Sequence, residues 1–332
     1  MTPDDRREIT AALVRMGLLA SGEAVAFTPL TGGVSSDIHL VTTGSRRFCV
    51  KRALARLKVA AVWEAPVSRN AAEAAWLRKA GAWLPRAAPA VLGEDPSLGL
   101  FAMAFLPPRD NPVWKAELLA GQVDAAFAAS VGRDLATIHA QSARDPSVPA
   151  AFAHDETFEA IRIEPYLLAT ARAHPDLGGP LAALAARTLA TKRVLVHGDV
   201  SPKNILHGPA GPVFLDAECA WFGDPAFDLA FCLNHLLLKG ARAGVDRAPY
   251  LAAYDSLVRA YLAGVDWEPA QDVEARAASL LPGLFLARVD GKSPVEYLAR
   301  EEERDAVRRC AVPLLRRAPA RLSELSSAWA MT

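Results

Sequence analysis

Two consecutive prolines, Pro107 and Pro108, separate two parts of this 332-residue chain that have different sequence patterns. Before the prolines, short apolar runs alternate with glycine-containing turns, which is typical of antiparallel strands. After them the chain is rich in alanine, and helices are expected at 113–142, 156–174 and 179–191. A chain of this length favours about two domains. We therefore expect an α+β protein with an N-terminal domain at 1–103 and a mainly helical C-terminal domain at 104–332.

The N-terminal part is expected to contain five strands, the first three of which form a meander. A short helix over 3–19 precedes the strands, and a second helix over 69–80 is expected to end at Gly81. The predicted strands are Phe27–Leu30, Ile38–Thr42, Arg47–Lys51, Val91–Gly93 and Leu100–Phe105. In the C-terminal part, two short strands are expected at 194–197 and 213–216, and helices from Pro225 onward.

Composition excludes several classes of protein. The chain has 37 basic and 37 acidic residues, whereas a chain that binds nucleic acid or an anionic membrane usually has a basic surplus. Hydrophobic residues make up 52%, which favours a folded protein over a disordered one. The four cysteines form no CxxC pair and are expected to be buried thiols. No apolar run reaches the roughly 20 residues of a membrane span, so we expect a cytoplasmic protein.

Polar residues stand at the ends of the two predicted C-terminal strands. Asp199 and Asn204 lie in the loop after 194–197, and Asp216 ends the strand at 213–216. Any one of them alone would be read as a turn or cap residue. Phosphoryl transfer needs a carboxylate for the acceptor hydroxyl and oxygen ligands for Mg²⁺. An Asp followed five residues later by an Asn has the spacing of a kinase catalytic loop. We predict Asp199 as the base and Asn204 and Asp216 as the Mg²⁺ ligands.

These motifs resemble the aminoglycoside phosphotransferase family, which is related to choline kinases and shares the bilobal protein-kinase-like fold. The resemblance covers about residue 25 to about residue 240 and rests on His197-Gly-Asp-x-x-x-x-Asn204, Leu215-Asp216-x-Glu218 and Gly223-Asp224-Pro225-x-x-Asp228-Leu229-Ala230. It implies a small lobe with an antiparallel sheet and one helix, and a large, mainly helical lobe, with ATP and Mg²⁺ bound between them. It also implies transfer of the γ-phosphate to a hydroxyl of a small molecule, such as an amino alcohol, a sugar, an aminoglycoside or a macrolide.

The resemblance also assigns residues to the nucleotide. The turn that contains Gly32, Gly33, Ser35 and Ser36 would let backbone N–H groups approach the phosphates. The family often has Asn where Ser36 stands. Lys51, at the end of the third strand, would pair with the α- and β-phosphates.

Glu73 has two interpretations. On the helix that follows Lys51, it fits the family's Lys–Glu ion pair, but Asn70-Ala-Ala-Glu73 also has the pattern of a capping box. We favour the ion pair, because the lysine and the other motifs are present.

The last strand of the N-terminal part would provide the adenine site. Met103 would stand at the gatekeeper position, and adenine would contact the backbone of Ala104 and Leu106. Pro107 and Pro108 have no N–H group to donate.

Four more residues near the catalytic loop receive roles from the resemblance. His197 would orient the loop and Asp228 would brace its backbone. Lys203 would neutralise charge in the transition state or be a solvated lysine. Glu218 would hold a metal-bound water or be an ordinary loop carboxylate. Further along, residues 293–296 have the pattern of a capping box that opens a helix.

The acceptor is left open by the sequence, as are the oligomeric state and the choice between ATP and GTP. Carboxylates after residue 240 are interspersed with arginines, so we expect a mixed or apolar acceptor pocket and weak aminoglycoside binding. A metabolic acceptor is as credible as an antibiotic.

Two other classes of protein fit the sequence less well. A catalytically silent, nucleotide-binding pseudokinase is the alternative function, but such proteins typically lack one of Lys51, Asp199, Asn204 or Asp216. A protein kinase would need an activation loop between Asp216 and Asp228, and that segment is too short.

Overall fold

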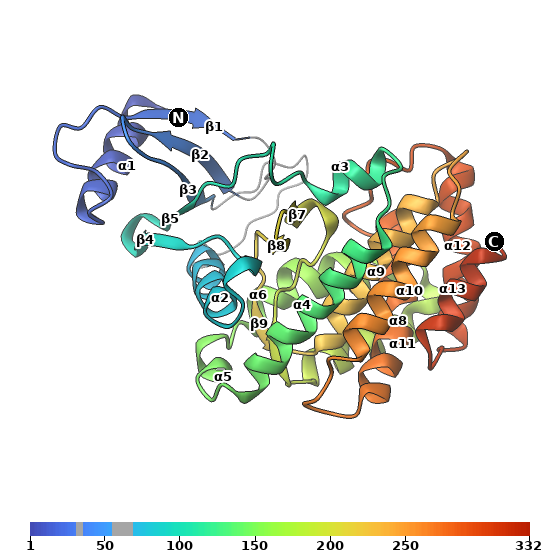
Figure 1. Ribbon diagram of the computed structural model, residues 1–332. Helices are drawn as coiled ribbons and strands as arrows, with labels where there is room; N and C mark the ends of the chain where they lie inside the picture. The colour runs from blue at the N-terminus through green and yellow to red at the C-terminus, as the bar shows by residue number, and fades with distance from the viewer. Residues whose placement is uncertain (31–35, 55–68) are drawn as a thin grey trace. The chain divides into compact units, whose positions relative to one another are not determined.

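The computed structural model describes residues 1–30, 36–54 and 69–332 (Figure 1). The chain forms two compact units, Met1–Pro107 and Pro108–Thr332. The division falls four residues after the boundary drawn from the sequence at residue 103, because β5 (Leu100–Ala104) and the residues that follow it belong to the first unit.

The first unit contains a five-stranded antiparallel sheet, with the strand order β1-β2-β3-β5-β4. Its strands are β1 (Ala26–Pro29), β2 (Ser36–Thr42), β3 (Arg47–Ala53), β4 (Val91–Asp95) and β5 (Leu100–Ala104). The predicted meander is confirmed, because β1 pairs with β2 and β2 pairs with β3. The segment between β4 and β5 contains the 3-10 turn η2 (Pro96–Leu98) and ends at Gly99, whose φ is 56°.

One face of this sheet is covered by α1 (Pro3–Arg15), which buries Ile9 and Leu13 against Val41 and Phe48. The helix ends at Arg15 and not at residue 19. The second helix, α2 (Arg69–Trp83), continues through Gly81, where the sequence had predicted its end. The described part of this unit therefore holds two helices, whereas one was expected from the resemblance.

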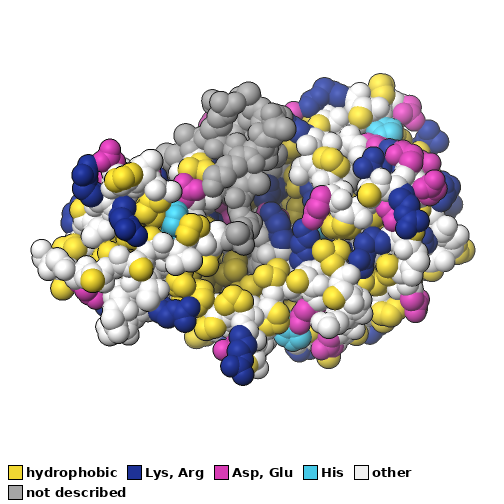
Figure 2. Space-filling view, turned by 90° about the horizontal axis from the view of Figure 1, so that it is seen from above, with side chains coloured by type: hydrophobic (Ala, Val, Ile, Leu, Met, Phe, Trp, Pro, Cys, Tyr) yellow, Lys and Arg dark blue, Asp and Glu magenta, His cyan; other side chains and the backbone are white. Residues whose placement is uncertain are grey.

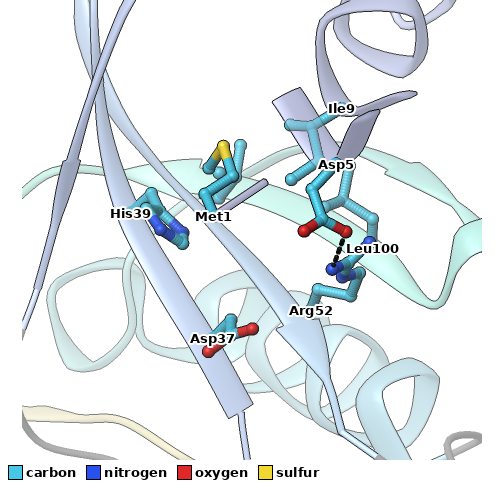
Figure 3. A pocket seen from close by; sticks show the side chains of 8 residues that line it. Met1, Asp5, Ile9, Asp37, His39, Arg52 and Leu100 are labelled. Atoms are coloured by element: carbon cyan, nitrogen blue, oxygen red, sulfur yellow. Dashed lines mark hydrogen bonds and ion pairs between the residues drawn. The ribbon is translucent and has the colours of Figure 1, made fainter. Parts of the chain in front are cut away.

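A cavity lies between α1 and the sheet, and Figure 3 shows its lining. The side chain of Arg52 on β3 forms an ion pair with Asp5 of α1 at 2.7 Å across this space. The cavity measures about 10 Å³, which is room for one water molecule at most. It is therefore a packing defect under α1 and too small for a nucleotide or a substrate.

The second unit is built around α9 (Pro225–Gly240), in which every residue is buried. It packs against α10 (Ala248–Leu262) and α11 (Ala270–Asp290), and α10 packs in turn against α4 (Ala125–Arg144), as Figure 1 shows. The helices α12 (Glu301–Arg316) and α13 (Leu322–Ala330) pack against α11. Because α9 is surrounded by other helices, side chains in its first turn have fixed positions and can hold neighbouring loops in place.

Of the three helices predicted between Pro108 and residue 191, the one at 179–191 is confirmed as α8 (Gly178–Ala190) and the other two are interrupted. The segment 113–142 contains α3 (Trp114–Leu119) and α4, separated where Gly121 adopts a φ of 78° and where Asp124 caps α4. The segment 156–174 is divided among α6 (Asp155–Phe158), the π-helix η3 (Glu159–Leu168) and α7 (Ala169–Ala173). Between these segments lies α5 (Val148–Ala151), and η4 (Pro175–Leu177) and α8 (Gly178–Ala190) follow α7.

Two short hairpin-like sheets carry the polar loops. β6 (Val194–Val196) pairs with β9 (Trp221–Gly223), and β7 (Ile205–Gly208) pairs with β8 (Gly211–Phe214). The strands β7 and β9 were not predicted from the sequence. The capping box predicted at 293–296 is wrong, because no helix begins there and Glu296 instead forms an ion pair with Lys115.

None of the described helices is long and apolar enough to cross a membrane. Figure 2 shows Lys and Arg side chains interspersed with Asp and Glu over the face it presents. The four cysteines are buried and none forms a disulfide.

A test of the second unit's packing uses Gly132, where α4 and α10 make a close approach. A Cβ at this position would lie 2.5 Å from the carbonyl oxygen of Leu257. We expect Gly132→Ala to lower the free energy of unfolding by about 1–3 kcal/mol, because the backbone must shift. Urea unfolding measures this. The control is Gly179→Ala, which meets no atom within 4 Å, and equal stability of the two variants would contradict the packing described.

Candidate active site

Asp228, in the first turn of α9, holds the backbone of the loop after β6. Its carboxylate accepts hydrogen bonds from the N–H groups of His197 (2.7 Å) and Gly198 (2.8 Å). His139 of α4 lies 3.2 Å from the same carboxylate through Nε2, and its Nδ1 lies 2.8 Å from the Tyr261 hydroxyl. Asp228 and His139 are completely buried. The loop is therefore attached to three helices of the core.

Gly198 has a backbone conformation and a close backbone contact that favour glycine at this position. Its φ is 78°, and a Cβ there would lie 2.6 Å from the carbonyl oxygen of Cys219. A side chain at this position would force the two polar loops apart.

His197 acts on the loop through both ring nitrogens. Nδ1 accepts a hydrogen bond from the N–H of Asp199 at 3.1 Å, and Nε2 lies 3.1 Å from the carbonyl oxygen of Leu215. Burial lowers the pKa of His197 below its usual range, although nearby carboxylates oppose the shift. A neutral imidazole with its proton on Nε2 satisfies both contacts. In this arrangement His197 positions Asp199 and does not itself act as a base.

The carboxylate of Asp199 is buried between two cations. Oδ2 lies 2.9 Å from Nη2 of Arg162 and 3.1 Å from Nζ of Lys203. Burial alone would raise the pKa of the Asp199 carboxyl, but Lys203 and Arg162 outweigh burial and hold this pKa below its usual range. Asp199 is therefore ionised at neutral pH and can accept a hydrogen bond from a hydroxyl group.

Arg162 was not identified in the sequence. It lies on the π-helix η3, donates to the carbonyl oxygens of Ile161 (2.6 Å) and Gly198, and reaches Asp199 from a segment 37 positions earlier in the chain. Arg162 belongs to none of the motifs described above. The sequence analysis predicted an ordinary helix over 156–174 and did not predict the π-helix. The nearest signal was a basic residue in an otherwise apolar segment.

Asn204 and Asp216, the predicted metal ligands, lie at adjoining positions of the hairpin β7–β8. Asn204 ends the turn η5 (Pro202–Asn204), and its Nδ2 donates to the carbonyl oxygen of Asp199 at 3.1 Å. The N–H of Leu215 donates to the carbonyl oxygen of Asn204 at 2.8 Å, which brings Asp216 beside it. Asp216 has a φ of 63°, a conformation that Asp tolerates better than most residues.

This donor set is suited to a hard divalent cation. The Asn204 amide uses its nitrogen within the loop, so its oxygen is the atom left to act as a ligand. Together with the Asp216 carboxylate it gives two oxygen ligands, the type that Mg²⁺ takes from proteins while keeping several waters. Glu218, two residues further along, is half-buried.

The first unit contains the ion pair expected between Lys51 and Glu73. Nζ of Lys51 on β3 lies 2.5 Å from Oε2 of Glu73 on α2, and each side chain is 2% exposed. The capping-box interpretation is wrong. Asn70 lies inside α2, where its side chain donates to the carbonyl oxygens of Gly99 (2.6 Å) and Lys51 (3.3 Å). Asn70 thus ties α2 to the strand that carries Lys51.

The remaining residues predicted to bind the nucleotide fall into two groups. Gly32, Gly33 and Ser35 lie outside the described residues. Ser36 is buried at the start of β2, and its hydroxyl has no hydrogen-bond partner within the described part of the chain.

The strand β5 carries the predicted adenine contacts. Met103 is buried and pairs with Cys49 of β3. The N–H of Ala104 already donates to the carbonyl oxygen of Ala90 at 2.9 Å. A contact through Ala104 would therefore have to use its carbonyl oxygen, and the predicted donor becomes the N–H of Leu106, which is half-buried.

Comparison with known proteins was made with the whole chain. The sequence profile of a family described as "Phosphotransferase enzyme family" matches residues 26–272. No curated protein sequence matches the chain. Among solved structures, a choline/ethanolamine kinase family protein from Mesorhizobium loti is 17% identical, with a TM-score of 0.54 over 98% of this chain and 99% of that chain.

Two other solved structures are similar over nearly the whole chain. An amicoumacin kinase is 12% identical, with a TM-score of 0.59 over 95% of this chain and 97% of that one. A macrolide 2′-phosphotransferase from Brachybacterium faecium is 18% identical, with a TM-score of 0.51 over 94% and 98% of the two chains. At these identities the likeness establishes the fold.

The brace at Asp228 can be tested by its effect on stability. Asp228→Asn replaces one acceptor oxygen by a donor, so a buried N–H of the loop loses its acceptor. We expect the free energy of unfolding to fall by about 1–3 kcal/mol, measured by urea unfolding. The control is Asp246→Asn, an exposed residue that accepts from the N–H of Ala248, where a change within about 0.5 kcal/mol is expected. Similar effects at the two positions would contradict the role of Asp228.

Proposed function

The chain belongs to the phosphotransferase enzyme family, and from this premise we propose that it transfers the γ-phosphate of ATP to a hydroxyl group of a small molecule. The family match confirms the resemblance drawn from the motifs, and the solved structures confirm the α+β, kinase-like fold. One observation carries the finer proposal. The Asp199 carboxylate is ionised and paired with two cations, in a loop whose Asn204 donates to the backbone of Asp199.

Asp199 would receive the acceptor. A substrate hydroxyl donates a hydrogen bond to its carboxylate, which aligns the oxygen lone pair with the γ-phosphorus. As the new P–O bond forms and the bond to the ADP oxygen breaks, the hydroxyl proton passes to Asp199. The transition state of phosphoryl transfer is loose, so the bond from the acceptor oxygen is only slightly formed. The acceptor hydroxyl therefore does not need a strong base. A carboxylate with a lowered pKa is adequate for this task, because its main contribution is orientation.

Two cations beside Asp199 have separate tasks. Asp199 raises the pKa of Lys203 to about 12, although burial opposes the shift, so Lys203 is charged throughout the physiological range. We assign it to the negative charge that spreads over the transferred phosphoryl oxygens. Arg162 bonds the Gly198 carbonyl as well as Asp199, and we assign it to holding the carboxylate in place.

The nucleotide would be held by residues of both sequence parts. Asn204 and Asp216 would hold Mg²⁺, which neutralises charge on the phosphates when bound. Lys51, kept in position by Glu73, would contact the α- and β-phosphates. We propose that the turn containing Gly32, Gly33, Ser35 and Ser36 binds the phosphates. Adenine would contact Met103, the carbonyl oxygen of Ala104 and the N–H of Leu106.

The catalytic role of Asp199 has a direct test. Asp199→Asn keeps the shape of the side chain but removes the proton acceptor. We expect turnover to fall by about 10²–10⁴, with ATP affinity nearly unchanged. ADP release is measured with ATP and with GTP against a panel of hydroxylated metabolites and antibiotics. Asp176→Asn, an exposed surface pair with Arg316, is the control. Wild-type turnover in Asp199→Asn, or absence of ADP release from the wild type with every acceptor, would overturn the proposal in favour of a silent nucleotide-binding protein.

The metal ligands can be tested separately from turnover. We expect Asp216→Ala to remove the Mg²⁺ dependence of ATP binding, because Asp216 supplies the only full charge of the proposed pair. Calorimetric titration of ATP with and without Mg²⁺ measures this. Glu218→Gln is the comparison, and an equal loss there would make Glu218 a holder of metal-bound water. A dissociation constant for Mg·ATP that Asp216→Ala leaves unchanged would place the metal elsewhere.

A further inference from the structure

One face of α9 leads away from the catalytic loop. Asp228, Phe231, His235 and Lys239 follow one another at spacings of three, four and four residues, so they share this face. Asp228 holds the loop, as described above. With a rise of 1.5 Å per residue, His235 lies about 10 Å and Lys239 about 16 Å further along the helix axis. This face therefore connects the site of phosphoryl transfer with a more distant group of polar residues.

Lys239 is a buried lysine with no carboxylate partner among the residues that the structure describes. Its side chain is 1% exposed and forms no ion pair in the part of the chain that the structure describes. Its ammonium lies 3.4 Å from the carbonyl oxygen of His235 and 5.1 Å from the ring centre of Tyr297. Burial, reinforced by the charges of Lys115 and Arg288, lowers the pKa of Lys239 to about 7. A buried cation is costly unless an anion accompanies it.

The polar atoms around Lys239 also lack partners among the described residues. Nε2 of His235, the Tyr297 hydroxyl and Nε of Arg288 are buried and form no hydrogen bond there. The side chain of His235 is 6% exposed. Buried polar atoms of folded proteins usually have a hydrogen-bond partner. These three side chains can therefore make further hydrogen bonds.

The charges in this region are unevenly distributed. Glu296 is paired with Lys115, and Asp199 with Arg162 and Lys203. Lys239 and Arg288 then have no carboxylate partner in the described chain. Burial lowers the pKa of His235 well below its usual range, and nearby cations, Lys239 first, act in the same direction. The charge on this part of the described chain is therefore positive, which favours an anion as a partner.

Aromatic side chains link this region to Asp199. The guanidinium of Arg162 lies 5.8 Å from the ring centre of Phe231 and 5.9 Å from that of Tyr166. Phe231 packs edge-to-face against His235 at 5.3 Å. Arg288 donates to the Tyr166 hydroxyl at 3.2 Å. These contacts join Lys239 and Arg288, which have no carboxylate partner among the described residues, to the proposed base.

We propose that the α9 cationic cluster, formed by His235, Lys239, Arg288 and Tyr297, binds a carboxylate or phosphate group of the acceptor. The inference rests on the proposed function and adds a substrate class to it. The acceptor presents its hydroxyl to Asp199 and its anionic group to the cluster. A polycation such as an aminoglycoside is repelled by the same charges.

Binding of small anions to the cluster is the first test. The probes are L-homoserine and glycerate for carboxylates, glycerol 3-phosphate and glucose 6-phosphate for phosphates, and glycerol, glucose, choline and kanamycin as neutral or cationic counterparts. Each is titrated while the unfolding temperature of the protein is followed. We expect carboxylates, phosphates or both to raise this temperature more than their counterparts, and the two arms tell which anion is recognised. Equal effects of charged and uncharged probes, or no effect of any anion, would overturn the proposal.

Variants assign that binding to the cluster. Lys239→Met keeps the volume and removes the charge, and we expect the affinity for the anion to fall about 10- to 100-fold. Lys192→Met, at a surface ion pair with Asp155, is the matched control and should bind like the wild type. Glu296→Gln removes a carboxylate whose charge acts on Lys239 and should strengthen binding about two- to fivefold. A folding defect cannot produce both directions of change. Unaltered affinity in Lys239→Met would overturn the assignment.

Turnover separates this inference from the proposed function. With anionic acceptors, kcat/KM should exceed that of the matched uncharged compounds by at least about 10-fold. Asp199→Asn should lower turnover by about 10²–10⁴ while retaining anion binding. Phosphorylation of neutral or cationic acceptors with equal kcat/KM would overturn the inference and leave the proposed function intact. Anion binding lost in Lys239→Met, without transfer to any acceptor, would support the cluster and reject the proposed function.

Discussion

The contact on which the second unit's chemistry depends is the carboxylate of Asp228 against two backbone N–H groups of the catalytic loop. The contact is completely buried, and α9, which carries Asp228, is surrounded by other helices. A loop held in this way cannot move without disturbing the core. The core therefore positions Asp199 and Asn204 indirectly, through the backbone that lies between them. The geometry of the proposed phosphoryl transfer therefore depends on the apolar packing of α9.

Charge around Asp199 determines what kind of base it can be. Arg162 and Lys203 hold its pKa low, which favours an ionised carboxylate over a strong proton acceptor. That choice suits a reaction whose transition state makes little demand on the nucleophile. The carboxylates of Asp199, Asp216 and Glu218 balance Arg162 and Lys203 in this part of the structure. Lys239 and Arg288 have no carboxylate partner among the described residues, and the proposed preference for an anionic acceptor rests on them.

Sequence reasoning succeeded where the relevant residues are close together in the chain. Asp199, Asn204 and Asp216 fall within 18 positions, and the fold and family could be predicted from that segment and from the shift in pattern at Pro107. It failed where geometry joins distant residues. Arg162 approaches Asp199 from a π-helix and has no local signal.

Other features depended on contacts that spacing does not reveal. Asn70 looked like a cap but lies inside α2, because its amide bonds the strand carrying Lys51. The expectation of a mixed acceptor pocket was based on carboxylates and arginines that are close together in the sequence. Closeness in the sequence does not show which of these side chains are close together in the fold. Lys115, Lys239 and Arg288 come together from three separate segments, which a sequence pattern cannot show.

Two lysines of the second unit show what a carboxylate partner does. Lys203 lies 3.1 Å from Asp199 and its pKa rises to about 12, whereas Lys239 has no such partner among the described residues and burial lowers its pKa to about 7. The charged and titratable groups that act on Lys239 are Cys232 and His235 on α9, Lys115 on α3, Arg288 on α11, and Glu296 and Tyr297 in the following segment. A bound anion would supply to Lys239 what Asp199 supplies to Lys203. The affinity of the protein for this anion would be greatest below about pH 7, where the Lys239 amine is already protonated. The affinity would fall as the pH rises, because the amine must then take up a proton when the anion binds.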